Sequence, residues 1–141
     1  MSESQIGVES YAGAQSESDL GFLRVMLVLQ IGLGLLWGIS MLFFAQVIVL
    51  GESSGPHVEK IALEGAAHMM LVFGAILLWR ARQPSRDVLL MMIFLNGLWT
   101  LTDLVYIPLL GLSEWDFYAK VVVNAILAIG LAVAGRRASI L

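Results

Sequence analysis

Polar side chains that could do chemistry interrupt the long apolar runs of this sequence. Inside a lipid bilayer an ionisable side chain costs about 2.5–3.5 kcal/mol at the centre of a helix, so each one there needs a structural or functional reason. The runs contain Glu64, His68, Asn96, Thr100, Asp103, Lys120 and Asn124. These residues are therefore the candidates for a functional site, and their spacing decides which of them can meet.

The spacing of these residues puts them on shared helix faces, because residues four and seven apart lie on one side of an α-helix. The pairs Glu64 with His68 and Lys120 with Asn124 are four apart, and Asn96, Thr100 and Asp103 form one stripe. At 1.5 Å per residue, the groups lie about 5–10 Å below one membrane surface. The sequence thus predicts a single inward-facing polar layer made of Glu64, His68, Asp103, Lys120 and Asn124.

Several kinds of chemistry fit such a layer. Lys120 is a natural counter-charge for Asp103 or Glu64, and His68 with Asp103 could act as acid and base. A metal site is disfavoured because a single histidine with carboxylates is a weak zinc set and Lys120 would repel a cation. The same groups could be structural, since polar contacts between transmembrane helices are common and average about 0.6 kcal/mol. The pattern leaves the functional and the structural interpretation open, and it assigns no cofactor.

Four apolar runs must position this layer. Hydrophobic residues make up 59% of the chain and charged residues 13%, against roughly 45–50% and 25% in soluble domains. Runs of about 20 apolar residues predict transmembrane helices over 21–49, 61–79, 88–106 and 117–135. We expect an all-α, up-down-up-down four-helix bundle over residues 20–137, with a mobile acidic tail at 1–19 and a short tail at 138–141.

Basic residues set the expected orientation of the bundle. With both termini inside, the inner side holds six arginines and the outer side two lysines. The arginines are Arg24, Arg80, Arg82, Arg86, Arg136 and Arg137, and the lysines are Lys60 and Lys120. The sequence therefore predicts a multi-pass membrane protein with its N and C termini in the cytoplasm.

Small residues mark where the helices can approach closely. Gly34 and Gly38 form a GxxxG pair in the first span, and Gly130 with Ala134 forms a similar pair in the fourth. We expect Gly34 and Gly38 to serve packing within the bundle, with dimerisation as the alternative. The polar residues of the first span are Gln30, Ser40 and Gln46.

The overall charge and the lack of cysteine exclude whole classes of function. A formal net charge of −3 disfavours a nucleic-acid partner, because phosphate backbones require clustered Lys and Arg. Without cysteine, the chain forms no disulfide, thiolate metal site or iron–sulfur cluster. Residues 1–19 contain no Lys or Arg, so a cleavable signal peptide is not expected.

The layout of the spans resembles that of a known group of small membrane proteins. A long first helix is followed by a loop, by the Glu64–His68 helix ending in Trp-Arg-Ala-Arg at 79–82, and by a tight hairpin. This order is similar to that of the bacterial four-helix membrane proteins of the DoxX-like and related uncharacterised groups, over roughly residues 32–137. The resemblance implies a protein of the bacterial cytoplasmic membrane and carries no activity over.

Three functions remain in competition. The first is a non-catalytic accessory or structural subunit that associates with itself or with another membrane protein, because almost no mass lies outside the bilayer. The second is a protein that binds or transports a small polar or amphipathic ligand in the predicted polar layer. The third is a membrane enzyme acting on a lipid or quinone, so catalytic residues stay unassigned at this point.

Overall fold

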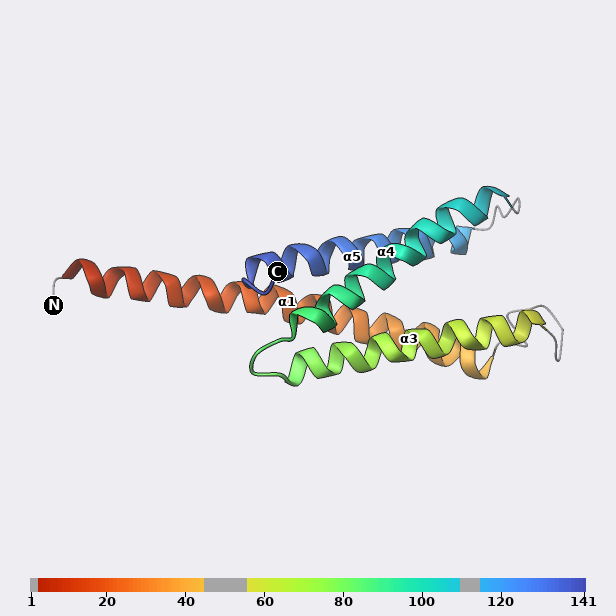
Figure 1. Ribbon diagram of the computed structural model, residues 1–141, viewed down its shortest axis with the longest axis horizontal. Helices are drawn as coiled ribbons and strands as arrows, with labels where there is room; N and C mark the ends of the chain where they lie inside the picture. The colour runs from red at the N-terminus through yellow and green to blue at the C-terminus, as the bar shows by residue number, and fades with distance from the viewer. Residues whose placement is uncertain (1–2, 45–55, 110–114) are drawn as a thin grey trace. The chain divides into compact units, whose positions relative to one another are not determined.

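The computed structural model describes residues 3–44, 56–109 and 115–141, and all elements in these ranges are α-helices. Within the ranges, the side chains of 3–18, 56–58, 106–107 and 115–117 are not described. The helices are α1 (Glu3–Phe43), α3 (Pro56–Arg80), α4 (Arg86–Leu109) and α5 (Trp115–Arg137) (Figure 1). The all-α prediction is thereby confirmed.

Each helix contains a stretch that is long and apolar enough to cross a membrane. Among the described residues these stretches are Asp19–Phe43, Glu59–Arg80, Arg86–Val105 and Tyr118–Arg137. A helix is the expected form for such runs, because it satisfies every backbone N–H and C=O internally where lipid offers no partner. The four stretches correspond to the four spans that hydropathy predicts.

Each helix begins earlier in the chain than the span predicted for it. Helix α1 begins at Glu3, so residues 3–19, which the sequence assigned to a tail, are helical. An existing helix extends without a new nucleation step, and this segment contains no proline to stop it. Residues 45–49 of the first predicted span, with Gln46, lie outside the described residues.

Local signals explain the boundaries of α4 and α5. Ser85 caps α4, since its Oγ accepts the Val88 N–H at 3.4 Å, and Pro84 precedes it. Helix α5 ends in a Schellman-type cap, in which Ile140 N–H donates to the Gly135 carbonyl at 2.9 Å. Ser139 adopts the left-handed conformation of this cap with φ of 54°.

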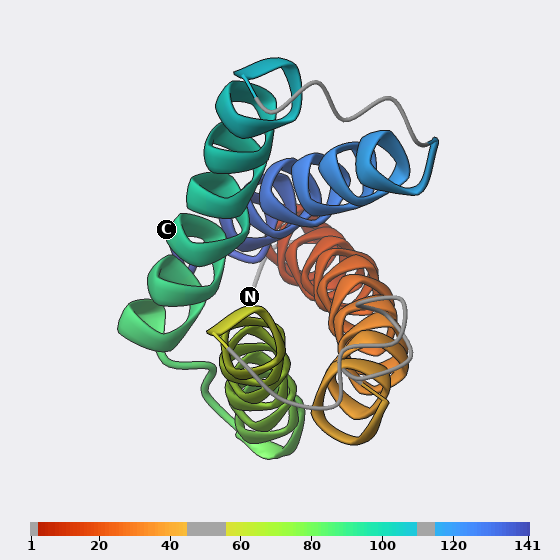
Figure 2. The ribbon, with the colours of Figure 1, turned by 90° about the vertical axis from the view of Figure 1, so that its right-hand side faces the viewer.

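The contacts divide the chain into two units. The first comprises residues 1–26 and 84–141, and the second comprises residues 27–83. In the first unit α4 packs beside α5 (Figure 2). Its buried apolar side chains include Leu89 and Met92 from α4, and Leu127 and Leu131 from α5.

The first unit also includes the start of α1. A Cβ built on Gly130 of α5 would collide with the side chain of Met26, and the Arg137 guanidinium lies 5.5 Å from the ring centre of Phe22. At the other contact of α5, a Cβ on Gly135 would come within 2.6 Å of Leu89 in α4. These contacts place the end of α5 against the start of α4 and the 22–26 stretch of α1.

The second unit is a close pair formed by the later part of α1 and by α3, which lie side by side in Figures 1 and 2. Glycine makes the closeness possible. A Cβ on Gly65 would lie 3.0 Å from the Gly38 carbonyl oxygen and 2.9 Å from the Leu42 amide nitrogen. A Cβ on Gly34 would lie 2.6 Å from Val72 Cγ2. Gly34 and Gly38 thus lie at the contact between α1 and α3, where backbone approaches backbone.

Candidate functional site

His68 is the polar residue of α3 that is most completely enclosed, with 2% of its surface exposed. Its Nδ1 lies 2.9 Å from the carbonyl oxygen of Glu64, one turn earlier in the same helix. A carbonyl oxygen only accepts hydrogen bonds, so this geometry assigns the ring proton to Nδ1. In the neutral ring the lone pair then belongs to Nε2.

One face of α1 packs against His68. The ring of Trp37 meets the imidazole edge-on, with centroids 6.1 Å apart and planes at 70°. The site of a Cβ on Gly34 lies 3.6 Å from the His68 carbonyl oxygen and 3.9 Å from Gln30 Nε2. Gln30 is also buried, at 1% exposed. The second unit therefore encloses an amide and an imidazole between α1 and α3.

Gln30 and Trp37 belong to this neighbourhood but are not among the candidate site residues predicted from the sequence. Together with Gly34 they follow the spacing i, i+4, i+7, which places them on one helix face. The signal that could have identified Gln30 and Trp37 is this pattern: a small residue lies between a polar and an aromatic residue on one face of a transmembrane helix. The sequence gives the shared face, but it does not tell which helix lies opposite.

In the first unit the polar stripe of α4 is bonded to its own backbone. Asn96 is 1% exposed and donates from Nδ2 to the Met92 carbonyl at 2.9 Å. Thr100 donates from Oγ1 to the Asn96 carbonyl at 2.9 Å. Asp103, one turn further along, is half-buried. Asn96 and Thr100 thus each place one donor on a carbonyl one turn earlier in the same helix.

Helix α5 contributes Lys120 and Asn124 to the same unit. Lys120 is half-buried, whereas Asn124 is 1% exposed. The Nδ2 of Asn124 has no hydrogen-bond partner within the part of the chain that the structure describes. A buried amide donor without a hydrogen-bond partner costs about 1–3 kcal/mol. The burial of Asn124 therefore needs a structural or functional reason.

The predicted polar layer draws on both units. Glu64 and His68 belong to the second unit, while Asp103, Lys120 and Asn124 belong to the first. The single five-residue layer stays a prediction.

Within residues 3–44, 56–109 and 115–141, no three His, Asp or Glu side chains gather closely enough to hold a metal ion.

Comparison with protein-family models, with curated proteins and with solved structures found no match for this chain.

Proposed function

We propose that the chain is a non-catalytic accessory subunit of the bacterial cytoplasmic membrane, associating in the bilayer with itself or with another membrane protein. The observation that carries this proposal is an apolar ridge along α4. Its members are Leu90, Phe94, Leu98, Leu101 and Val105, and all are exposed. Four of the five follow the spacing i, i+4, i+7, i+11 from Phe94, which is the seam spacing of paired helices.

Helix α4 is also the span with the most surface to offer. Only 17% of its apolar membrane-crossing segment is buried inside the protein, against 39% for the corresponding segments of α3 and α5. Because most of the described chain consists of apolar helices, a partner would recognise it through helix faces inside the bilayer. We therefore assign the partner surface to the α4 ridge.

The bonding of the polar residues favours a structural role over catalysis. His68, Asn96 and Thr100 each hydrogen-bond a carbonyl of their own helix one turn earlier. Such bonds let a polar side chain remain in an apolar setting without a ligand. For a membrane enzyme acting on a lipid or quinone, the described residues offer no observation comparable to the α4 ridge.

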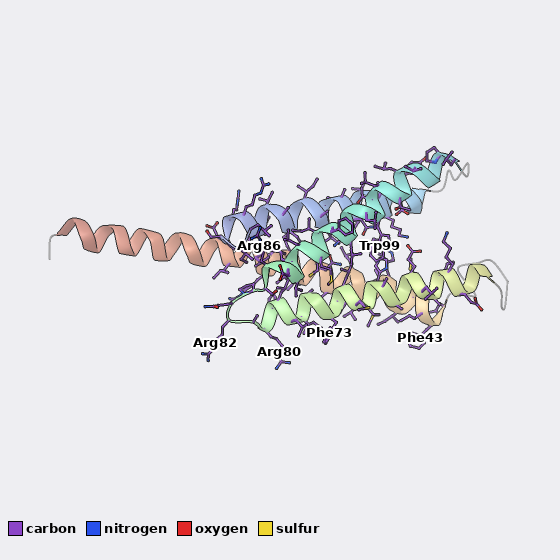
Figure 3. All side chains as sticks on the ribbon, in the orientation of Figure 1. Phe43, Phe73, Arg80, Arg82, Arg86 and Trp99 are labelled. Carbon is purple, nitrogen blue, oxygen red and sulfur yellow. The ribbon has the colours of Figure 1, made fainter. Side chains whose placement is uncertain are left out.

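The membrane orientation belongs to the same proposal. The six arginines are exposed, and all except Arg24, which lies inside α1, are at or near helix ends. Arg80 and Arg82 project outward beside the turn between α3 and α4 (Figure 3). Placing them all on one side agrees with the tendency of cytoplasmic loops to carry Lys and Arg. We propose an up-down-up-down bundle with both termini in the cytoplasm.

Cysteine cross-linking tests the accessory role, because the chain contains no cysteine of its own. Phe94→Cys places a thiol on the α4 ridge at a residue that is 66% exposed, and Phe73→Cys is the matched control on α3 at 62% exposed. Figure 3 shows Phe73 projecting from α3. Oxidation in intact membranes should give a disulfide-linked dimer or a heavier adduct with Phe94→Cys only.

Two outcomes would contradict this assignment. Equal adduct yields from both variants would indicate random collision in the bilayer. No disulfide-linked dimer from Phe94→Cys, with the protein present at normal levels, would remove the α4 ridge as a surface for self-association.

A second candidate function, binding of a small polar or amphipathic ligand, is favoured by Asn124. A ligand oxygen that accepts from its Nδ2 would offset the cost of the buried amide. Native mass spectrometry of the protein in mild detergent, compared with Asn124→Leu, tests this. A small molecule retained by the wild type and lost by the variant would support binding, whereas the same spectrum from both would reject it.

A further inference from the structure

Four arginines gather at one end of the first unit. Arg86 stands at the start of α4, Arg136 and Arg137 stand at the end of α5, and Arg24 lies in the neighbouring stretch of α1. We call these four residues the basic end. All four side chains are exposed.

Contacts between the three helices fix the positions of these arginines along the helix axes. Leu89 of α4 lies against Gly135 of α5, and Phe22 of α1 lies against Arg137. Arg86 is three residues from Leu89, and Arg24 is two residues from Phe22. At 1.5 Å per residue, each arginine lies within about one turn, 5.4 Å, of a contact that joins two helices. The three helices therefore present their cations at the same level.

The guanidinium groups of the basic end belong to exposed side chains. Within the described residues, no ion pair or side-chain hydrogen bond engages Arg24, Arg86 or Arg136. The guanidinium of Arg137 lies over the ring face of Phe22. This contact uses the flat face of the guanidinium and leaves the N–H donors in its plane accessible. Asp19 and Asp87 are the acidic side chains described beside this cluster, so positive charge predominates.

The guanidinium groups indicate which class of ligand the basic end can bind. All the cations of the basic end are arginines, and a guanidinium presents a planar fork of donors that matches two phosphate oxygens at once. Arg86, Arg136 and Arg137 lie at the ends of stretches that can cross a membrane, which is the level of lipid headgroups, and Arg24 lies five residues inside the stretch Asp19–Phe43. Each basic residue near an anionic membrane surface contributes about 1 kcal/mol of attraction.

We propose that the basic end binds the phosphate of an anionic phospholipid headgroup. Two or more guanidiniums from different helices hold the phosphodiester, so the lipid bridges the start of α4 and the end of α5. This inference requires that the chain resides in a membrane, but it is independent of the α4 ridge and of any partner protein. Failure of the cross-linking experiment above would leave it standing.

Lipid retention by the purified full-length chain tests the proposal. The delipidated protein in neutral detergent is titrated with phosphatidylglycerol, with phosphatidylcholine or with inorganic phosphate, and bound molecules are counted by native mass spectrometry. We expect phosphatidylglycerol to bind at least tenfold more tightly than phosphatidylcholine. The doubly substituted Arg86→Gln, Arg136→Gln variant should lose about 25-fold in phosphatidylglycerol affinity, because two cations contribute about fivefold each.

Two further variants make the result specific to the cluster. Arg80→Gln with Arg82→Gln removes the same charge from the second unit, and it should change the affinity by less than fivefold. Arg86→Lys with Arg136→Lys keeps the charge but loses the planar fork, and it should fall between the wild type and the Gln variant. Because these side chains are exposed, all variants should keep the wild-type unfolding temperature.

Three results would overturn the proposal. Equal binding of phosphatidylglycerol and phosphatidylcholine would remove the anionic preference. An equal loss from the Arg80, Arg82 control would show an effect of total charge rather than of the basic end. Displacement of phosphatidylglycerol by millimolar inorganic phosphate would identify a site for free phosphate instead of a lipid headgroup.

Discussion

The substitution Gly65→Ala probes the closest approach between α1 and α3. The added Cβ would lie 2.8 Å from Met41 Cβ, 2.9 Å from the Leu42 amide nitrogen and 3.0 Å from the Gly38 carbonyl oxygen. An ordinary contact begins at 3.4 Å, so the shortest of these distances falls short by about 0.6 Å. Two of the three atoms belong to the backbone, and no side-chain rotation moves them away. The helices must therefore separate.

The expected magnitude follows from two opposing terms. Overpacking of this kind costs about 1–3 kcal/mol, while replacing glycine by alanine in a helix returns up to about 1 kcal/mol. With the full helix gain, Gly65→Ala should lower the free energy of unfolding by about 0–2 kcal/mol, and by about 1–3 kcal/mol relative to a glycine-to-alanine change without the clash. Gly97→Ala is the matched control, because a Cβ on Gly97 meets nothing within 4 Å. It should be neutral or stabilise the protein by up to about 1 kcal/mol.

Gly130→Ala separates backbone clashes from side-chain clashes. The three atoms nearest to its Cβ would all belong to the flexible side chain of Met26, so a change of rotamer can relieve the collision and the cost should be smaller than at Gly65. Unfolding of the detergent-solubilised protein, followed by circular dichroism during titration with a denaturing detergent, measures all three variants. If Gly65→Ala is as stable as Gly97→Ala, the close backbone approach of α1 and α3 is refuted.

Three other outcomes are expected. Ser139→Gly should stabilise the end of α5 by about 1 kcal/mol, because glycine adopts a φ of 54° without the penalty of a Cβ, and an unchanged or lower melting temperature would contradict this. Asp103→Asn and Lys120→Met should be non-additive in a double-mutant cycle, with coupling on the order of 3 kcal/mol if they form the buried pair, whereas additive effects would separate them. Reporter fusions at Pro84 should read cytoplasmic and those at Ser54 external, and the reverse pattern would invert the proposed orientation.

The sequence predicted the helical class and the four apolar stretches because both depend on local composition. Helix ends were predicted less well, since hydropathy marks where lipid begins and not where the backbone stops being helical. Helix α1 begins at Glu3, in a polar segment that hydropathy does not register. Helix α5 likewise continues two residues beyond Gly135 to Arg137.

The candidate site was predictable only as far as single helix faces. The spacing of Asn96 and Thr100 predicted a shared face, but their hydrogen bonds to carbonyls of their own helix were not foreseen. Short polar side chains choose between backbone and tertiary partners according to what packs nearby. The edge-on contact of Trp37 with His68 depends on the pairing of α1 with α3, which one sequence without covarying relatives does not specify.

The contact between Met26 and Gly130 has a consequence for the order of assembly. These residues stand roughly 100 positions apart, whereas α4 and α5 are neighbours along the chain. During synthesis the ribosome releases Met26 long before Gly130 exists, so the early part of α1 must wait for α5. Local helix pairs form first because they close short loops. Folding should therefore end with the docking of the last helix against the first.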